Sequence, residues 1–461
     1  MRKSLILSFC FITLFASAQS VKEKLANAVQ QLEADSLLRH AIIGFYVADS
    51  KTGLPVYEHN AQVGLAPAST QKIFTSIAAF ELLGHDFKYS TAFNYLQDKK
   101  NPGAVTLQIE SNGDPSFGSS RYISAKANIV LNMLAKNLSQ QKVKTISSTV
   151  FLKNKFDDNI PGGWIWEDIG NYYGATAQNF NWIENQFDIV LQSGKNIGDS
   201  VGITALQPAS VNYEIEDAVI AAAKGTGDKT IVYIPYAGKA TTIAGTIPIE
   251  EKHFEVSAAI TDPRAVFCRQ LQDRLKKEGI VFNDKYENSK TPDTINSSTV
   301  LYKYLSPTLD SLNYWFLRKS INLYGEAFLK TIAFKESGIG STQKGLEVLK
   351  DFWTKHGIEK TALNTCDGSG LSPQNRVTAN AEVQALLYAK TRPWFDSFYD
   401  ALPTYNGIKM KSGSIGGARA FTGYQKAQDG KDYCFSIIVN NYSGEAIATI
   451  RKIYALLDIL K

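Results

Sequence analysis

The spacing of apolar residues divides the chain into an α/β start, a β-rich middle and an α/β end. Near the start, apolar residues recur at helical spacing over 21–35 and 69–83, which predicts two helices. Between them, an apolar run, a turn and a returning run predict a β-hairpin over 41–59. Residues 85–258 then carry short alternating stretches separated by turns, which predicts mostly β-strands and allows a helix near 123–138.

The final part of the chain returns to helical spacing and then to alternation. Its predicted helices are 266–278, 306–337, 343–355 and 444–460, and its predicted strands are 407–411, 419–425 and 433–440. The terminal strands and helices indicate one sheet that is built from both chain ends. We therefore expect an α/β (α+β) domain formed by 19–84 and 259–461, with 85–258 as a β-rich insertion of one or two small subdomains.

The first 18 residues have the composition of a secretory signal peptide. Basic residues Arg2 and Lys3 precede an apolar run over 4–15, and 16–18 form a small-x-small cleavage site. The apolar run is shorter than the about 20 residues that a spanning helix needs, which argues against a membrane anchor. We therefore expect cleavage after Ala18, export, and no integral membrane span.

Composition then excludes several classes of function. The 461 residues include 49 Lys and Arg against 44 Asp and Glu, and a net charge of +5 spread over this length does not indicate nucleic-acid binding. With 4 cysteines and 5 histidines, neither a disulfide scaffold nor a His/Cys metal cluster is expected. We therefore expect no metal and no cofactor. The sequence leaves open whether a disulfide forms among Cys268, Cys366 and Cys434.

An exported enzyme with few histidines often pairs a serine nucleophile with a lysine base in a Ser-x-x-Lys motif at the start of a helix. The chain contains three such pairs: Ser69 with Lys72, Ser139 with Lys142, and Ser341 with Lys344. Ser69 opens a strongly apolar helix after a loop that contains proline, whereas Ser139 lies in the inserted block and no Ser-x-Asn follows Ser341. This context selects Ser69 and Lys72, and a lysine base requires a pKa lowered by burial or by a nearby cation.

Two further motifs follow Ser69 in the order typical of acylating serine enzymes. Ser320 and Asn322 form a Ser-x-Asn motif, and 411–414 read Lys-Ser-Gly-Ser. A cation and a hydroxyl on an edge strand suit a substrate carboxylate. The other Lys-[Ser/Thr]-Gly match, at 51–53, fills a predicted hairpin turn before every candidate serine, so we interpret it as structural.

With these motifs in order, the chain closely resembles the low-molecular-mass class C penicillin-binding proteins, which are D-alanyl-D-alanine carboxypeptidase/endopeptidases. The matching segments are 68–72, 319–326, 367–372 and 411–414, with 113–115, 163–168 and 173–175 in the insertion. The resemblance spans nearly the whole chain after the signal peptide and includes the insertion itself. It implies a β-lactamase/transpeptidase-like catalytic domain, with an antiparallel sheet flanked by helices.

The resemblance also implies catalytic roles. Ser69 would attack the carbonyl of the D-Ala–D-Ala bond, while Lys72, held neutral near Lys411, takes its proton. Ser320 would pass a proton to the leaving D-alanine amine. Asn322 would bind the substrate amide and help to fix Lys72.

The same resemblance implies that the motif at 411–414 binds the substrate. Lys411 and Ser412 would bind the terminal carboxylate beside Gly413, and the backbone N–H groups of Ser69 and Ser414 would hold the oxyanion. Ser412 stands where the family usually has threonine, which keeps the hydroxyl, and Ile321 stands where some members have aspartate. We expect little functional loss from either departure.

The resulting hypothesis is a periplasmic serine-type carboxypeptidase and/or endopeptidase that acts on peptidoglycan stem peptides and is inhibited covalently by β-lactams. One alternative is a β-lactamase or esterase on the same fold, which would deacylate rapidly. Another is a non-catalytic peptidoglycan-binding scaffold, although a scaffold has no chemical need for Lys72 or Asn322. The segment 367–372 could be structural or contact substrate. The sequence leaves open the substrate's diamino acid, the role of the insertion and the oligomeric state.

Overall fold

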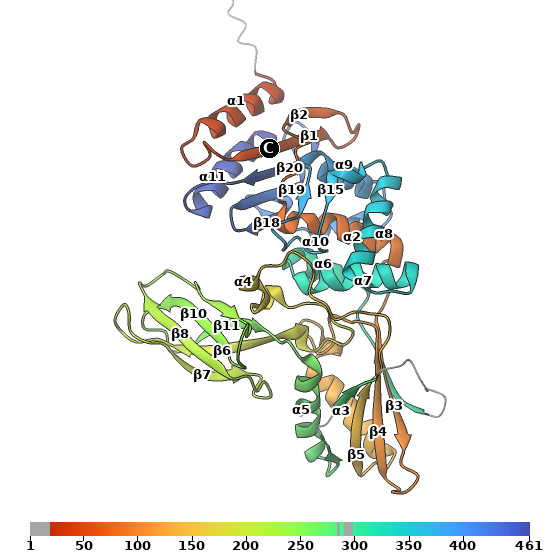
Figure 1. Cartoon of the computed structure of the whole chain (residues 1–461). Helices are drawn as coiled ribbons and strands as arrows, with labels where there is room; N and C mark the ends of the chain where they lie inside the picture. Colours follow the sequence, from red (N-terminus) through yellow and green to blue (C-terminus); the bar gives the residue numbers. More distant parts are fainter. Residues whose placement is uncertain (1–18, 284–285, 290–297) are drawn as a thin grey trace, which may run out of the picture.

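The computed structural model describes residues 19–283, 286–289 and 298–461, so the expected signal peptide lies outside the described residues. Within these ranges, no helix is long and apolar enough to cross a membrane. The described chain forms an α/β domain at one end, which contains the Ser69, Ser320 and Lys411 motifs and is called the catalytic domain below, and two β-rich lobes at the other end (Figure 1).

The two chain ends meet in one six-stranded sheet with the order β17-β18-β19-β20-β1-β2. Every neighbouring pair is antiparallel, and β1 from the start of the chain pairs with β20 from its end. The expected antiparallel sheet built from both ends is therefore confirmed. The strands are β1 (Ile42–Asp49), β2 (Pro55–His59), β17 (Thr404–Tyr405), β18 (Ile408–Ile415), β19 (Ala418–Lys426) and β20 (Asp432–Asn440).

Helices cover both faces of this sheet (Figure 1). Alternate residues of β1 point to opposite faces, so Phe45 and Val47 pack with α1 (Val21–Ala34) and α11 (Ala446–Leu457). On the opposite face, the sheet contacts α2 (Lys72–Leu83) through its preceding 3₁₀ turn, together with α9 (Ala379–Lys390). The further helices on this side are α6 (Leu309–Arg318), α7 (Asn322–Ser337), α8 (Thr342–Lys355) and α10 (Phe395–Ala401), and a small hairpin joins β15 (Leu363–Asn364) to β16 (Arg376–Val377).

The single helix predicted over 306–337 is wrong, because the structure breaks it into α6 and α7. Ser320 adopts a left-handed backbone conformation with φ 58°, which a continuous right-handed helix does not allow. Apolar residues keep helical spacing across the break, so the break cannot be detected from the sequence pattern. The consequence is that Ser320 lies in a tight connection and Asn322 begins a new helix.

The inserted part of the chain forms two lobes. The first contains the sheet β12-β5-β4-β3-β14, with β13 beside β5, and packs against α3 (Ala127–Gln140) and α5 (Pro263–Lys276). Its strands are β3 (Ser90–Gln97), β4 (Ala104–Ser111), β5 (Thr145–Phe151), β12 (Val281–Phe282), β13 (Tyr286–Asn288) and β14 (Thr299–Leu305). Since β14 pairs with β3, we propose that the insertion ends near Leu305 rather than at residue 258.

The second lobe consists of two three-stranded sheets, with the orders β8-β10-β9 and β11-β6-β7. Its strands are β6 (Gln186–Gln192), β7 (Gly202–Gln207), β8 (Ile215–Ala222), β9 (Ile231–Tyr233), β10 (Thr241–Pro248) and β11 (Phe254–Ala259). The short helix α4 (Trp166–Ile169) lies where this lobe meets the catalytic domain (Figure 1).

A buried lysine joins the insertion to the catalytic domain. Lys330 lies on α7, and its side chain is fully buried. Its Nζ donates hydrogen bonds to the carbonyl oxygens of Asp157, Asn159 and Ala177 at 2.8–3.1 Å and pairs with the Asp157 carboxylate at 2.9 Å. One ammonium group thus holds two loop segments of the insertion against α7.

We predict that Lys330→Met lowers the free energy of unfolding by about 3 kcal/mol, because it leaves buried acceptors without a donor. Urea denaturation followed by circular dichroism would measure this change. Lys344→Met is the matched control, because Lys344 forms only a partly exposed pair with Glu347 on α8 and its loss should change stability little. Equal stability of the two variants would contradict the prediction.

Candidate active site

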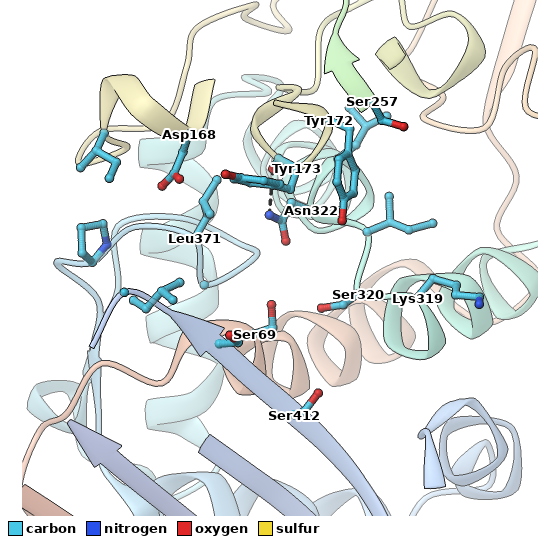
Figure 2. Close-up of a pocket in the computed structure, with 18 of the residues that line it drawn as sticks. Ser69, Asp168, Tyr172, Tyr173, Ser257, Lys319, Ser320, Asn322, Leu371 and Ser412 are labelled. Atoms are coloured by element: carbon cyan, nitrogen blue, oxygen red, sulfur yellow. Dashed lines mark hydrogen bonds between the residues drawn. The ribbon is translucent and has the colours of Figure 1, made fainter. Parts of the chain in front are cut away.

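A pocket of about 800 Å³ lies between the catalytic domain and the insertion. The catalytic domain contributes serines and an amide from all three sequence motifs: Ser69, Ser320, Asn322, Ser412 and Ser414. Figure 2 shows Ser69, Ser320 and Ser412 on one side, facing Asp168, Tyr172 and Tyr173 of the insertion. The three motifs, which are far apart in sequence, therefore meet at one site.

Lys72 lies directly behind Ser69 and is fully buried. Its Nζ donates to the Ser69 Oγ at 2.9 Å, to the Asn322 Oδ1 at 2.6 Å and to the Ser369 carbonyl at 2.6 Å. An ammonium has three N–H groups, and these three acceptors match them. When the amine is neutral, its lone pair is within hydrogen-bond distance of the serine hydroxyl, which is the geometry that a general base requires.

Burial lowers the pKa of Lys72 to about 7, while the nearby Asp367 and Glu326 carboxylates act in the opposite direction. We expected Lys411 to contribute to this shift, but burial is its main cause. Glu326 is fully buried as well, and burial with the charge of Asp367 raises its pKa to about 7. Near neutral pH, the site can therefore hold a neutral lysine at moderate energetic cost.

The backbone around Ser69 is tightly enclosed. Ser69 lies in a 3₁₀ turn over Ala68–Gln71, and Ala68 has a positive φ of 49°. Gly413 on β18 approaches so closely that a Cβ there would collide with the Pro67 carbonyl oxygen and lie 3.1 Å from the Ser69 nitrogen. Only glycine permits this approach, so Gly413 fixes the distance between β18 and the serine turn.

Asn322 connects the catalytic domain with the insertion. It is the first residue of α7, and its Oδ1 accepts the hydrogen bond from Lys72. Its Nδ2 donates to the carbonyl oxygen of Tyr173 at 2.8 Å, the dashed line in Figure 2. Ser320 lines the pocket beside it, held by its left-handed backbone conformation. The amide orientation of Asn322 is therefore fixed from both sides.

Lys411 lies behind the pocket wall rather than on it. Only 1% of its surface is exposed, and its Nζ donates to the carbonyl oxygen of Ser412 at 2.8 Å. Burial and the charge of Lys72 hold the pKa of Lys411 well below its usual range. The hydroxyl-bearing residues that line the pocket from β18 are Ser412 and Ser414. A bound carboxylate beside this strand would favour the charged form of Lys411.

The segment 367–372 runs along the start of α2. Gln71, Lys72 and Thr75 donate, in turn, to the backbone carbonyls of residues 367, 369 and 368. The buried Asp367 carboxylate accepts hydrogen bonds from the side chains of Gln71, Trp164 and Asn375 and from the backbone N–H groups of Gly370 and Ser372. Most of this segment is therefore structural support for the serine–lysine pair, while Gly370 and Leu371 reach the pocket.

The insertion supplies the opposite wall of the pocket, which sequence reasoning did not assign. Glu184 accepts hydrogen bonds from Arg121 at 3.0 Å and from the Tyr324 hydroxyl of α7 at 2.7 Å. Asp168 lines the same wall, and burial raises its pKa. The family-like segments 163–168 and 173–175 contain some residues of this wall and could have indicated it. Arg121 and Glu184 lie in no motif.

The two rejected Ser-x-x-Lys pairs have other environments. The Ser341 side chain caps α8 by accepting a hydrogen bond from the Lys344 backbone N–H at 3.2 Å. Ser139 is exposed near the end of α3. Both lie outside the pocket, so the tertiary environment distinguishes Ser69 from serines with the same local motif.

Groups suited to metal binding are absent from the described ranges: no set of three or more His, Cys, Asp or Glu residues is placed to hold an ion. Cys366 and Cys434 are free thiols.

Comparisons with known proteins identify the family of the chain. The sequence profile of the D-Ala-D-Ala carboxypeptidase 3 (S13) family matches residues 25–458. A D-alanyl-D-alanine carboxypeptidase from Actinomadura sp. (strain R39) is 23% identical, over 94% of this chain and 84% of the relative.

Two solved structures show the same fold. Penicillin-binding protein 4 (DacB) from Haemophilus influenzae has a TM-score of 0.78 at 23% identity, over 94% of this chain and 98% of that one. The same protein in complex with a β-lactam has a TM-score of 0.74 at 21% identity, over 95% and 99% of the two chains. The expected β-lactamase/transpeptidase-like fold is therefore confirmed. Because the family profile spans nearly the whole chain, including every motif of the pocket, this protein belongs to the D-Ala-D-Ala carboxypeptidase 3 (S13) family and is a serine peptidase.

Proposed function

We propose that the protein hydrolyses D-Ala–D-Ala or related DD-peptide bonds of peptidoglycan stem peptides through an acyl-enzyme on Ser69. The observation that carries this proposal is the fully buried Lys72, whose Nζ lies 2.9 Å from the Ser69 Oγ at the wall of an open pocket. Such a pair supplies a nucleophile and its base without a histidine.

In the first step, neutral Lys72 accepts the Ser69 hydroxyl proton while the Oγ forms a bond to the scissile carbonyl carbon. The carbonyl electrons move to its oxygen, which the backbone N–H groups of Ser69 and Ser414 stabilise. As the C–N bond breaks, Ser320 donates its hydroxyl proton to the leaving amine and takes up the proton that Lys72 had accepted, which restores neutral Lys72. Water then cleaves the ester and regenerates Ser69.

We assign recognition of the substrate's terminal carboxylate to β18. The Ser412 and Ser414 residues lie at the pocket wall, and the bound carboxylate favours the charged form of Lys411 behind them. In this arrangement, Ser412 donates to the carboxylate directly, while the buried ammonium acts through its field.

β-Lactams carry a reactive carbonyl and a nearby carboxylate, the same pair of groups that we assign to the Ser69 and β18 contacts. The related Haemophilus protein has been crystallised with a β-lactam. We infer that β-lactams acylate Ser69 here too. The substrate lies in the cell wall, so we retain export by residues 1–18 and a periplasmic location as part of the proposal.

Analysis of the products from purified muropeptides would separate the two peptidase activities. Release of free D-alanine from monomers indicates a carboxypeptidase, whereas conversion of crosslinked dimers to monomers indicates an endopeptidase. Absence of both reactions, with intact folding, would overturn the proposed function.

We predict that Ser69→Ala abolishes covalent labelling by a fluorescent penicillin, whereas the unchanged protein takes up one label per chain. The reason is that no other hydroxyl is hydrogen-bonded to Lys72 in the described ranges. Ser139→Ala is the matched control, because Ser139 has the same local motif but lies outside the pocket, and it should label fully. Labelling of Ser69→Ala after denaturing electrophoresis would refute the nucleophile assignment.

We predict that the acylation rate constant rises with pH through about 7, the pKa of Lys72. Below that pH the amine is protonated and cannot accept a proton, so the rate should fall about tenfold per pH unit. Above it the neutral base predominates, and the rate should level off. Stopped-flow measurement with a chromogenic β-lactam between pH 5.5 and 8.5 would test this, and a flat profile would argue for another base.

We predict that Gly413→Ala slows acylation by about 100-fold, because the added methyl pushes β18 away from Ser69 and disrupts the oxyanion contacts. Gly202→Ala on β7 is the control, since a Cβ there meets no atom within 4 Å. Its acylation rate should equal that of the unchanged protein. Equal rates for both variants would mean that the close approach has no catalytic importance.

A further inference from the structure

A second hollow, of about 660 Å³, lies on the other side of α4 from the active-site pocket. We call it the aromatic shelf, defined by the rings of Trp166, Tyr233 and Tyr236. Trp166 lies 4.7 Å from Tyr233 and 6.5 Å from Tyr236 between ring centroids. Trp166 is 48% exposed and Tyr236 is 93% exposed. Folding gains little from rings left in water, so this clustering points to a ligand.

The rim of the shelf is polar and mainly acidic. Glu167, Glu214 and Glu216 are exposed around it, against the single cation Lys239. Carboxylates accept hydrogen bonds from hydroxyl groups, and aromatic faces attract the weakly positive C–H faces of a sugar ring. A surplus of negative charge repels phosphate polymers and anionic lipid surfaces. The lining therefore favours a neutral, hydroxyl-rich ligand with apolar ring faces, which is a saccharide.

The shelf and the active-site pocket share the short helix α4. The helix α4 places Trp166 on the shelf and Asp168 in the pocket. The Trp166 Nε1 donates to the Ile234 carbonyl at 3.1 Å, and the Val232 N–H donates to the Asn171 Oδ1 at 3.1 Å. These bonds hold α4 and the following turn against β9 and its loop.

We propose that the aromatic shelf binds the glycan strand of peptidoglycan while one of that strand's stem peptides occupies the pocket. This inference rests on the proposed function, because it takes the glycan and the peptide as parts of one polymer. A polymer that lies along α4 would place its glycan on the shelf and its stem peptide in the pocket at the same time. Binding of the glycan would then raise the effective concentration of the peptide at Ser69. The second lobe of the insertion would then act as a substrate-binding lobe.

Isothermal titration calorimetry with a soluble tetramer of N-acetylglucosamine tests the shelf without any peptide. We expect the unchanged protein to bind the tetramer and Tyr236→Ala to bind it about tenfold more weakly, because the variant removes one stacking ring. Ile197→Ala is the matched control, since Ile197 is 69% exposed in the same lobe but lies outside the shelf. Tyr236 is too exposed for its loss to affect folding, and Trp166→Ala provides a second variant.

The second readout is the ratio of activity on intact, insoluble peptidoglycan to activity on a short soluble D-Ala–D-Ala peptide. We expect this ratio to fall about tenfold in Tyr236→Ala and to stay constant in Ile197→Ala. Failure of the tetramer to bind, with peptidase activity intact, would overturn the shelf assignment and leave the proposed function standing. Binding of a sugar-free stem peptide that Tyr236→Ala weakens, without tetramer binding, would overturn it in favour of a peptide site. An inactive protein that still binds the tetramer would instead reject the proposed function.

Discussion

The structure of the site depends on one buried amine. Taking an ammonium out of water costs several kcal/mol, so Lys72 is tolerated only where acceptors replace its hydration or where it loses its proton. Its three acceptors come from the serine turn, from the start of α7 and from the loop at residue 369. The fold must therefore bring together groups that lie 250 and 297 positions from Lys72 in sequence. Packing of α2 against α7 and of the 367–370 segment against α2 achieves this.

The insertion separates Ser69 from Asn322 in sequence but stabilises the site in space. Lys330 and Tyr324, both on α7, bond to insertion loops, and Trp164 bonds to the buried Asp367. Each contact joins a helix or loop of the catalytic domain to the insertion, and Glu184, the partner of Tyr324, also lines the pocket. The insertion therefore forms part of the pocket, and these contacts connect its two sides.

Features with a local signal could be predicted from the sequence, whereas features set by tertiary contact could not. The Ser69 motif at the start of an apolar helix and the terminal strands of the main sheet follow from periodicity and order. The break at Ser320 was missed, because apolar spacing continues through it and only the backbone conformation reveals it. The pairing of β14 with β3 was also missed, because the residues of a strand do not indicate which distant strand it pairs with. The raised pKa of Glu326 was missed as well, because it follows from burial, and a glutamate in a sequence does not indicate a buried side chain.

The two hydrogen bonds of Asn322 connect Lys72 and the insertion to opposite ends of one planar amide. Its carbonyl oxygen is held by Lys72 and its NH₂ group by the Tyr173 turn. Because the amide is planar, a shift of the turn that carries the amide with it also changes the bond to the lysine. By thermodynamic linkage, a ligand that moves this turn must change the proton affinity of Lys72, and protonation of Lys72 must change the affinity for that ligand. A single side chain, Asn322, thus links the insertion to the amine that is hydrogen-bonded to Ser69.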